Sequence, residues 1–190
     1  DVRRINEAED IVQYIEEELA RQLNDGFWNG ILVENFNTSV ASSPYWKIYL
    51  AAQITLNESA FLSKDMKVRT LVENRGDVHH IFPKDYLQKN GKNSRVLYNQ
   101  IANFALIQTE TNLQITNKAP NVYMAEVMMQ CNTKEATIGS ILDREVLEEN
   151  LRINCIPQGF SKMSIENFDD FLKQRRILMA QKIKEYYYSL

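Results

Sequence analysis

The chain is poor in the residues that interrupt regular structure, with 6 glycines and 4 prolines in 190 residues. Such a composition favours long helices over an architecture of many strands and turns. No apolar run approaches the roughly 20 residues that a membrane-crossing helix needs, and the first residues lack the apolar stretch of a secretion signal. The sequence therefore predicts a globular protein without a membrane segment, and the expected compartment is the cytoplasm.

Cysteine and histidine are also scarce, with two of each. Cys131 and Cys155 lie far apart in the sequence, and neither has a second thiol nearby that would complete a metal-binding pair. We expect both to be reduced and buried. The two histidines, in contrast, are adjacent, at His79 and His80.

A strong charge of one sign is missing as well, because the net charge is -3. Residues 1–76 hold 8 basic and 12 acidic side chains, residues 77–120 hold 5 and 3, and residues 121–190 hold 9 and 10. The one positive segment is therefore the segment that contains the histidines. Its excess is small, but the sign suits a surface that faces phosphate.

Hydrophobic periodicity predicts helices over most of the chain. Apolar residues at steps of three and four start at Ile5, and Asp25-Gly26 should end this first helix. Ser43 and Pro44 supply the start of a second helix, and Ser63 is expected to cap a third. The expected helical ranges are 5–24, 45–56, 64–74, 84–90, 110–117, 121–130, 143–154, and a long final helix from residue 164.

Two short segments read instead as strands, residues 77–82 between Gly76 and Pro83, and residues 103–108. With the helix expected after Thr109, the order is strand, loop, strand, helix. The fold class that we expect is α+β, mostly α: a helical domain with an embedded small two-stranded element.

The chain is expected to divide into an N-terminal helical segment, 1–76, a central element, 77–120, and a C-terminal helical segment, 121–190. The three should form one compact domain, excised from a longer protein because the sequence begins without methionine.

The adjacent histidines offer what hydrolysis of a phosphodiester requires, a base that is neutral near pH 7 and a metal ligand. Neighbouring side chains on a regular strand point to opposite faces, so both can reach one phosphate only if the strand ends or distorts at His80. Pro83 favours such an end. The alternative is that the pair only packs in a half-buried strand. Asn103, and Asn112 nine residues later, favour the catalytic interpretation.

The run Asp77-Val78-His79-His80-Ile81-Phe82-Pro83, followed by Ala102-Asn103-Phe104-Ala105-Leu106-Ile107, Asn112 and Lys118, resembles the ββα-metal fold of HNH (His-Me finger) endonucleases. Within that group it is most similar to the C-terminal domain of GmrSD-type, modification-dependent restriction endonucleases. The motif covers residues 77–120, and the flanking helices resemble the family less specifically.

The resemblance implies a role for each residue of the motif. His80 would be the general base, Asn103 would fix the loop that orients it, and Asp77 would orient its neighbours. His79 and Asn112 would bind one divalent metal ion.

Lys118 and Lys84 would bind phosphate. Many HNH enzymes have a further histidine where this chain has Thr116, so the metal site is poor in ligands. Mg²⁺ or Mn²⁺ is therefore favoured over tightly held zinc.

The resemblance also implies partners: DNA, and an upstream ParB-like NTPase domain of the same or a partner chain. The expected function is metal-dependent cleavage of DNA in restriction and phage defence. Two alternatives stay open at this point, a non-catalytic DNA-binding or partner-docking domain with a degenerate motif, and a helical interaction module. A homodimer also stays open.

Overall fold

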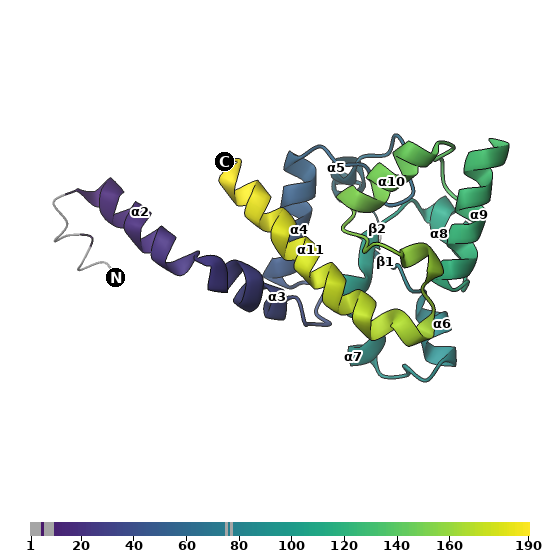
Figure 1. The fold of residues 1–190 in the computed structure, drawn as a ribbon, viewed down its shortest axis with the longest axis horizontal. Coiled ribbons are helices and arrows are strands. Elements are labelled where there is room, and N and C mark those ends of the chain that lie inside the picture. The colour runs from purple at the N-terminus through teal and green to yellow at the C-terminus, as the bar shows by residue number, and fades with distance from the viewer. Residues whose placement is uncertain (1–4, 6–9, 75, 77) are drawn as a thin grey trace.

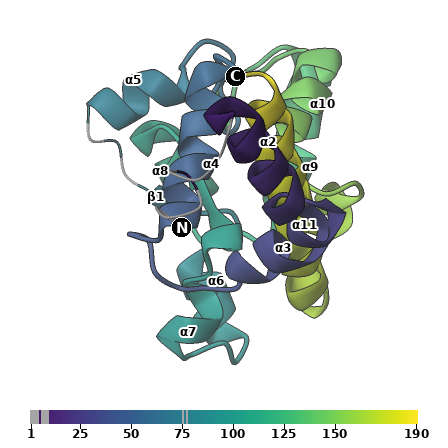
Figure 2. The ribbon, with the colours of Figure 1, turned by 90° about the vertical axis from the view of Figure 1, so that its left-hand side faces the viewer.

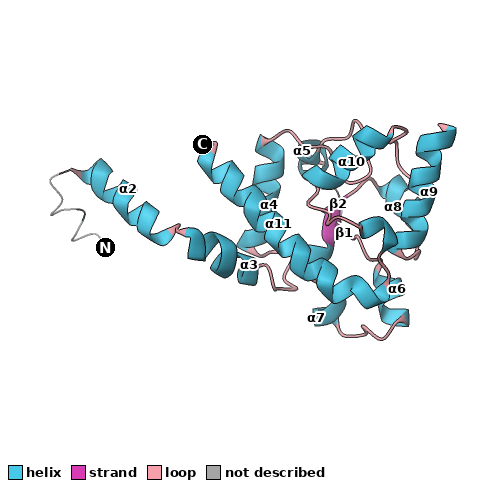
Figure 3. Cartoon of the chain, viewed as in Figure 1, coloured by secondary structure: helices cyan, strands magenta, loops and turns pink. Residues whose placement is uncertain are grey.

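The computed structural model describes residue 5, residues 10–74, residue 76 and residues 78–190. Figure 1 shows a mostly helical chain, and Figure 3 shows its two strands near the middle of the main body. The α-helices are α2 (Ile11–Gln22), α3 (Leu32–Asn35), α4 (Pro44–Thr55), α5 (Val68–Glu73), α6 (Lys84–Lys89), α7 (Arg95–Tyr98), α8 (Thr109–Ile115), α9 (Pro120–Thr133), α10 (Arg144–Ile153) and α11 (Phe168–Tyr188). Shorter helical turns are the π-helical η1 (Phe27–Ile31) and the 3-10 turns η2 (Ile101–Asn103), η3 (Phe160–Lys162) and η4 (Ile165–Asn167).

The strands β1 (Val78–His80) and β2 (Phe104–Leu106) form an antiparallel pair in which His80 lies opposite Phe104. Two residues, Ile107 and Gln108, separate the end of β2 from the start of α8. The expectation of a mostly helical α+β fold with a small two-stranded sheet is thus confirmed. No helix in the described part of the chain is long and apolar enough to cross a membrane.

The long last helix, α11, organises the core. It packs against α3, α4 and η1, and Figures 1 and 2 both show it running across the body of the molecule. Phe82, just after β1, lies with its ring centroid 5.0 Å from that of Phe168 and 4.9 Å from that of Phe171. One hydrophobic cluster includes residues from all three expected segments, so α11 holds the strands against the helical body.

Two charged side chains of α11 are buried. Arg175 donates to the carbonyl oxygens of Ala102 and Phe104 at 2.8 and 2.7 Å. Lys182 forms a buried ion pair with Glu58. Because a buried guanidinium needs acceptors, Arg175 fixes α11 to the peptide groups that lead into β2.

The first helix is shorter than expected and lies outside the core. Helix α2 ends at Gln22. Asp25 and Gly26 do not terminate the helical structure as expected, because they lead into η1. None of the residues of α2 is buried, and Figure 1 shows the helix projecting from the body. Its apolar residues Ile15 and Leu19 are 43% and 42% exposed.

Capping explains which helix starts were predicted well. Ser43 accepts from the N–H of Tyr45, and Pro44 opens α4, as expected. The predicted cap at Ser63 is wrong: α5 begins at Val68, and the Ser63 hydroxyl donates to Gln108 and accepts from the N–H of Met66.

Proline also opens α9. This helix was expected over residues 121–130, and it begins one residue earlier, at Pro120. At the first position of a helix the missing N–H has no intrahelical partner to lose, so proline is tolerated there.

Candidate active site

The end of β1 positions the histidine pair. The strand stops at His80, and residues 81–82 form a bend, which confirms the expectation that the strand ends there. The His80 ring lies edge-on to Phe104 on the paired strand, with 5.3 Å between centroids, and edge-on to Tyr98 at 6.2 Å. These two rings restrict how the imidazole can turn.

Asn103 closes the loop that follows His80. It is fully buried, its Oδ1 accepts from the N–H of Phe82 at 2.8 Å, and its Nδ2 donates to the carbonyl of Phe82 at 3.0 Å. Its own carbonyl accepts from the N–H of Ile81 at 2.8 Å. The hydroxyl of Tyr123 donates to the carbonyl of Ile81 at 3.0 Å. Both residues after His80 are therefore fixed by hydrogen bonds at their N–H and at their carbonyl.

His80 is half-buried, and its Nε2 lies 3.2 Å from Oδ1 of Asn99. Burial lowers the pKa of His80 below its ordinary value, because a charged imidazolium loses hydration there. Nearby Lys84 and His79 lower this pKa further, while the hydrogen bond to Asn99 opposes the shift. This shift favours the neutral imidazole, the form that a general base needs.

The two expected metal ligands lie on different elements. His79 pairs with Ala105 in the sheet, and Asn112 lies in the middle of α8, where both side chains are half-buried. The Nε2 atom of His79 is buried. Asp77, the acidic residue of the motif, lies outside the described residues.

The ligand set is small. Within residues 10–74, 76 and 78–190, no three or more His, Cys, Asp and Glu side chains come together in a way that could hold a metal ion. Thr116, at the position where many HNH enzymes have a histidine, has φ +55° and donates its hydroxyl to the carbonyl of Ile115. One imidazole and one amide suit an ion that keeps most of its water, and such loose binding is typical of Mg²⁺.

The two candidate phosphate-binding lysines differ in their surroundings. Lys84, at the start of α6, is exposed, and its Nζ lies 5.5 Å from the centre of the Tyr98 ring, which contacts the His80 ring. Lys118 forms an ion pair with Glu126, with 2.7 Å between Nζ and Oε2. Lys84 is therefore near the base with its charge available, whereas the charge of Lys118 is already partly balanced.

Sequence reasoning missed two residues that bear on this site, Asn99 and Arg175. Asn99 follows α7 with no pattern around it, so nothing in the sequence pointed to it. Arg175 stands three residues after Leu172 and four before Met179, both apolar positions of the same helix face. An arginine on the apolar stripe of a helix was a usable signal for a buried, structurally bonded side chain.

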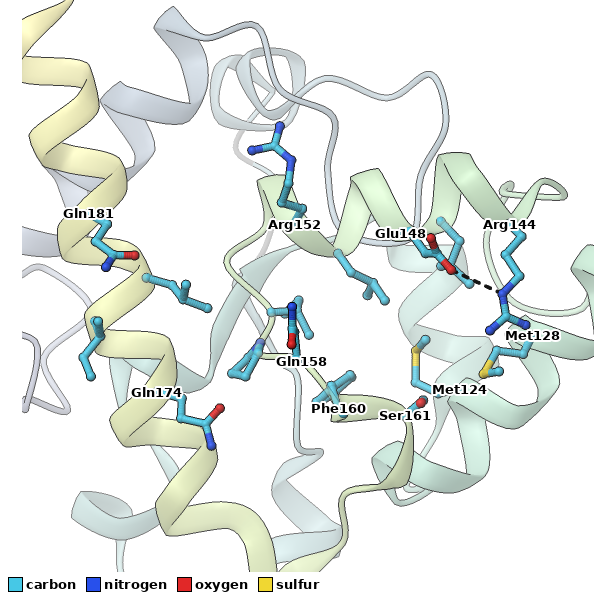
Figure 4. A pocket seen from close by; sticks show the side chains of 17 residues that line it. Met124, Met128, Arg144, Glu148, Arg152, Gln158, Phe160, Ser161, Gln174 and Gln181 are labelled. Atoms are coloured by element: carbon cyan, nitrogen blue, oxygen red, sulfur yellow. Dashed lines mark hydrogen bonds and ion pairs between the residues drawn. The ribbon is translucent and has the colours of Figure 1, made fainter.

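A cleft of about 870 Å³ lies elsewhere on the molecule, between α9, α10, η3 and α11. Figure 4 shows Met124 and Phe160 in its wall and the polar side chains of Gln158, Gln174 and Gln181 around it. None of the expected site residues lines it. The cleft is therefore separate from the histidine site.

Comparison with known proteins gives one distant relative. No model of a known protein family matches the chain, and no solved structure matches it. An uncharacterized protein of Methanocaldococcus jannaschii is 31% identical over 120 residues, a match that covers 56% of this chain and 20% of that protein. The chain thus spans about a fifth of the length of this relative.

Proposed function

We propose that the chain is a metal-dependent endonuclease domain that hydrolyses DNA phosphodiester bonds, the nuclease part of a restriction or phage-defence protein. The observation that carries the proposal is the buried Asn103 amide, which bonds the N–H and the carbonyl of Phe82 and so fixes the turn directly after His80. A histidine that only packed would not need the following turn held in this way. A general base does need it, because small displacements of a catalytic group reduce its rate severely.

In the proposed reaction His80 removes a proton from a water molecule, whose oxygen attacks phosphorus as the bond from phosphorus to the leaving oxygen breaks, and that oxygen then takes a proton from solvent. The lowered pKa of His80 and its place at the end of β1 suit this role. Lys84, exposed beside the Tyr98 ring, would bind a phosphate oxygen next to the cleaved bond. Lys118 would contribute less, since Glu126 already balances its charge.

His79 and Asn112 would hold the divalent ion, with Mg²⁺ or Mn²⁺ favoured by this neutral, ligand-poor pair. When bound, the ion would stabilise the negative charge that develops on the phosphate and on the leaving oxygen. The two side chains come from β1 and α8, and a short connection joins α8 to β2, the strand that pairs with β1.

The proposal extends to partners. The positive charge of residues 77–120 favours DNA as the substrate. This segment holds 5 basic and 3 acidic side chains, in an otherwise acidic chain. Recognition of modified bases and NTP-driven control would belong to an upstream ParB-like NTPase domain, in the same or a partner chain. An enzyme with this role would act in the cytoplasm.

The test is cleavage of supercoiled plasmid by the purified chain in Mg²⁺ or Mn²⁺. We expect His80→Ala to lower the rate roughly 10²- to 10⁴-fold, the usual contribution of a general base. That range corresponds to about 3 to 5.5 kcal/mol of transition-state stabilisation. The matched control is Asn90→Ala, an exposed residue whose amide bonds only the Tyr86 carbonyl, and it should cleave at the wild-type rate.

A thermal melt of each protein accompanies the assay, so that a loss of activity is not confused with a loss of fold. Full-rate cleavage by folded His80→Ala would falsify the assignment. Plasmid binding without any cleavage by the wild type, in either metal, would favour the non-catalytic DNA-binding alternative.

A further inference from the structure

Asn99 bonds the candidate base directly, and no motif includes it. We infer that Asn99 is a positioning residue: it holds His80 in the tautomer with hydrogen on Nε2, so that Nδ1 is the nitrogen that accepts the proton. This inference rests on the proposed function for its catalytic meaning. The tautomer itself follows from hydrogen-bond geometry.

The orientation of the Asn99 amide decides the tautomer. Its Nδ2 lies 3.1 Å from the carbonyl oxygen of Ser39, and its Oδ1 lies 3.2 Å from Nε2 of His80. A carbonyl oxygen can only accept, so the NH₂ group must face Ser39 and the amide oxygen must face His80. Because that oxygen also only accepts, Nε2 must carry the hydrogen. The other ring nitrogen then has a free lone pair.

The amide cannot easily turn over. Ser39 and Thr38 lie in the connection between α3 and α4, and the carbonyl of Thr38 accepts from the N–H of Ile101 at 2.9 Å. Two hydrogen bonds therefore join this connection to the chain on either side of Gln100. Reversing the amide would place the Asn99 oxygen against the Ser39 oxygen, which is repulsive.

The remaining nitrogen of His80 is accessible. Within the described part of the chain, Nδ1 of His80 makes no hydrogen bond, and it is not among the buried side-chain atoms that lack a partner. Phe104 and Tyr98 restrain the ring from its edges. Asn99, Phe104 and Tyr98 together present Nδ1 to solvent, where a water molecule can reach it.

The test combines a spectroscopic readout with cleavage. Nitrogen-15 NMR of the imidazoles reports which ring nitrogen carries hydrogen, and a His79→Gln protein identifies the His80 signals, since the chain has two histidines. We expect hydrogen on Nε2 in the wild type and in Asn99→Asp, which keeps the acceptor oxygen. In Asn99→Leu, similar in size but without an acceptor, the signals should move towards a mixture of tautomers.

Cleavage should follow the same order. Asn99→Leu should lower kcat roughly 10- to 100-fold, the usual effect of removing a residue that orients a site ligand. KM should change little, and Asn99→Asp should recover much of the rate. Asn90→Leu is the matched control, because the exposed Asn90 side chain bonds the carbonyl of Tyr86, and it should leave both the spectrum and the rate unchanged.

Hydrogen on Nδ1 in the wild type would overturn the inference, as would a His80 spectrum unchanged in folded Asn99→Leu. Should Asn99→Leu not fold, Asn99→Ala replaces it, and the wild-type spectrum alone can still overturn the tautomer. Failure of the wild type to cleave DNA would remove the proposed function instead. The spectra would then decide separately whether Asn99 sets the tautomer of His80.

Discussion

The two sides of the candidate site differ in how firmly the chain holds them. On the base side, His80 is bonded by Asn99, and Asn103 and Tyr123 hold the next two residues. On the proposed metal side, the side-chain amide of Asn112 makes no hydrogen bond to the part of the chain that the structure describes. The chain itself thus holds His80 and the turn after it, whereas the proposed ion would have to order the Asn112 side chain.

This difference predicts which substitutions change stability and which change only activity. Hydrogen bonds around a buried amide contribute to folding as well as to positioning, because the groups they satisfy are out of reach of water. Neutral, half-exposed ligands contribute little to folding. Substitutions on the base side should therefore change stability and activity together, and substitutions on the metal side should change activity alone.

The largest expected effect is that of Asn103→Leu. The change leaves the N–H and the carbonyl of Phe82 buried without partners, at roughly 1 to 3 kcal/mol each in the free energy of unfolding. Urea unfolding measures the loss, with Asn112→Leu as the matched control on the metal side, expected within about 0.5 kcal/mol of the wild type. Equal losses in the two proteins would contradict the comparison.

Asn112→Ala should act through the metal. With one of two protein ligands removed, the Mg²⁺ or Mn²⁺ concentration that supports half-maximal cleavage should rise by roughly 10-fold or more. The maximal rate at saturating metal should fall much less than in His80→Ala. A metal titration of plasmid nicking gives both quantities, and an unchanged half-maximal concentration would remove Asn112 from the ligand set.

Lys84→Ala and Lys118→Ala should differ in their effect on DNA binding. Each phosphate contact contributes a slope of roughly 0.9 to the fall of log affinity with log salt concentration. Lys84→Ala should lower the slope by about that amount, and Lys118→Ala by less, because Glu126 already balances Lys118. Equilibrium binding to a short duplex at several salt concentrations measures both, and a larger effect at Lys118 would reverse the order.

The smallest expected effect is that of removing metal from the intact chain. If the ion only completes a site built by the fold, EDTA should leave the unfolding temperature unchanged while it abolishes cleavage. Structural zinc sites behave oppositely, because their binding energy is folding energy. Calorimetry with and without EDTA makes the measurement, and a large fall in unfolding temperature would show a structural metal.

Local patterns predicted the elements that depend on local physics. The strand predicted over residues 77–82 forms at Val78–His80, and α4 starts after Ser43 as predicted, since caps and prolines act within a few residues. Ser63 misled because its hydroxyl is engaged by Gln108, 45 residues away. Whether a side chain caps a helix or bonds a distant residue depends on the tertiary fold, and the neighbouring sequence does not show it.

The residues of the candidate site also differ in whether the sequence alone could predict them. His80 and Asn103 could be selected from the motif, which places His80 at the end of one strand and Asn103 directly before the strand that pairs with it. Asn99 could not, because its role depends on the Ser39 carbonyl, 60 residues earlier in the chain. α7 was missed as well, since a helix of 4 residues is too short to show a hydrophobic period.

The buried Arg175 also bears on when the site can exist. During synthesis β1 and β2 leave the ribosome well before α11, yet the carbonyls of Ala102 and Phe104 receive their guanidinium partner only from that last helix. Phe82 likewise waits for Phe168 and Phe171 to bury it. The strand pair is therefore completed only after α11 has been synthesised. In the proposed nuclease, the site would form only once that helix has packed onto the strands.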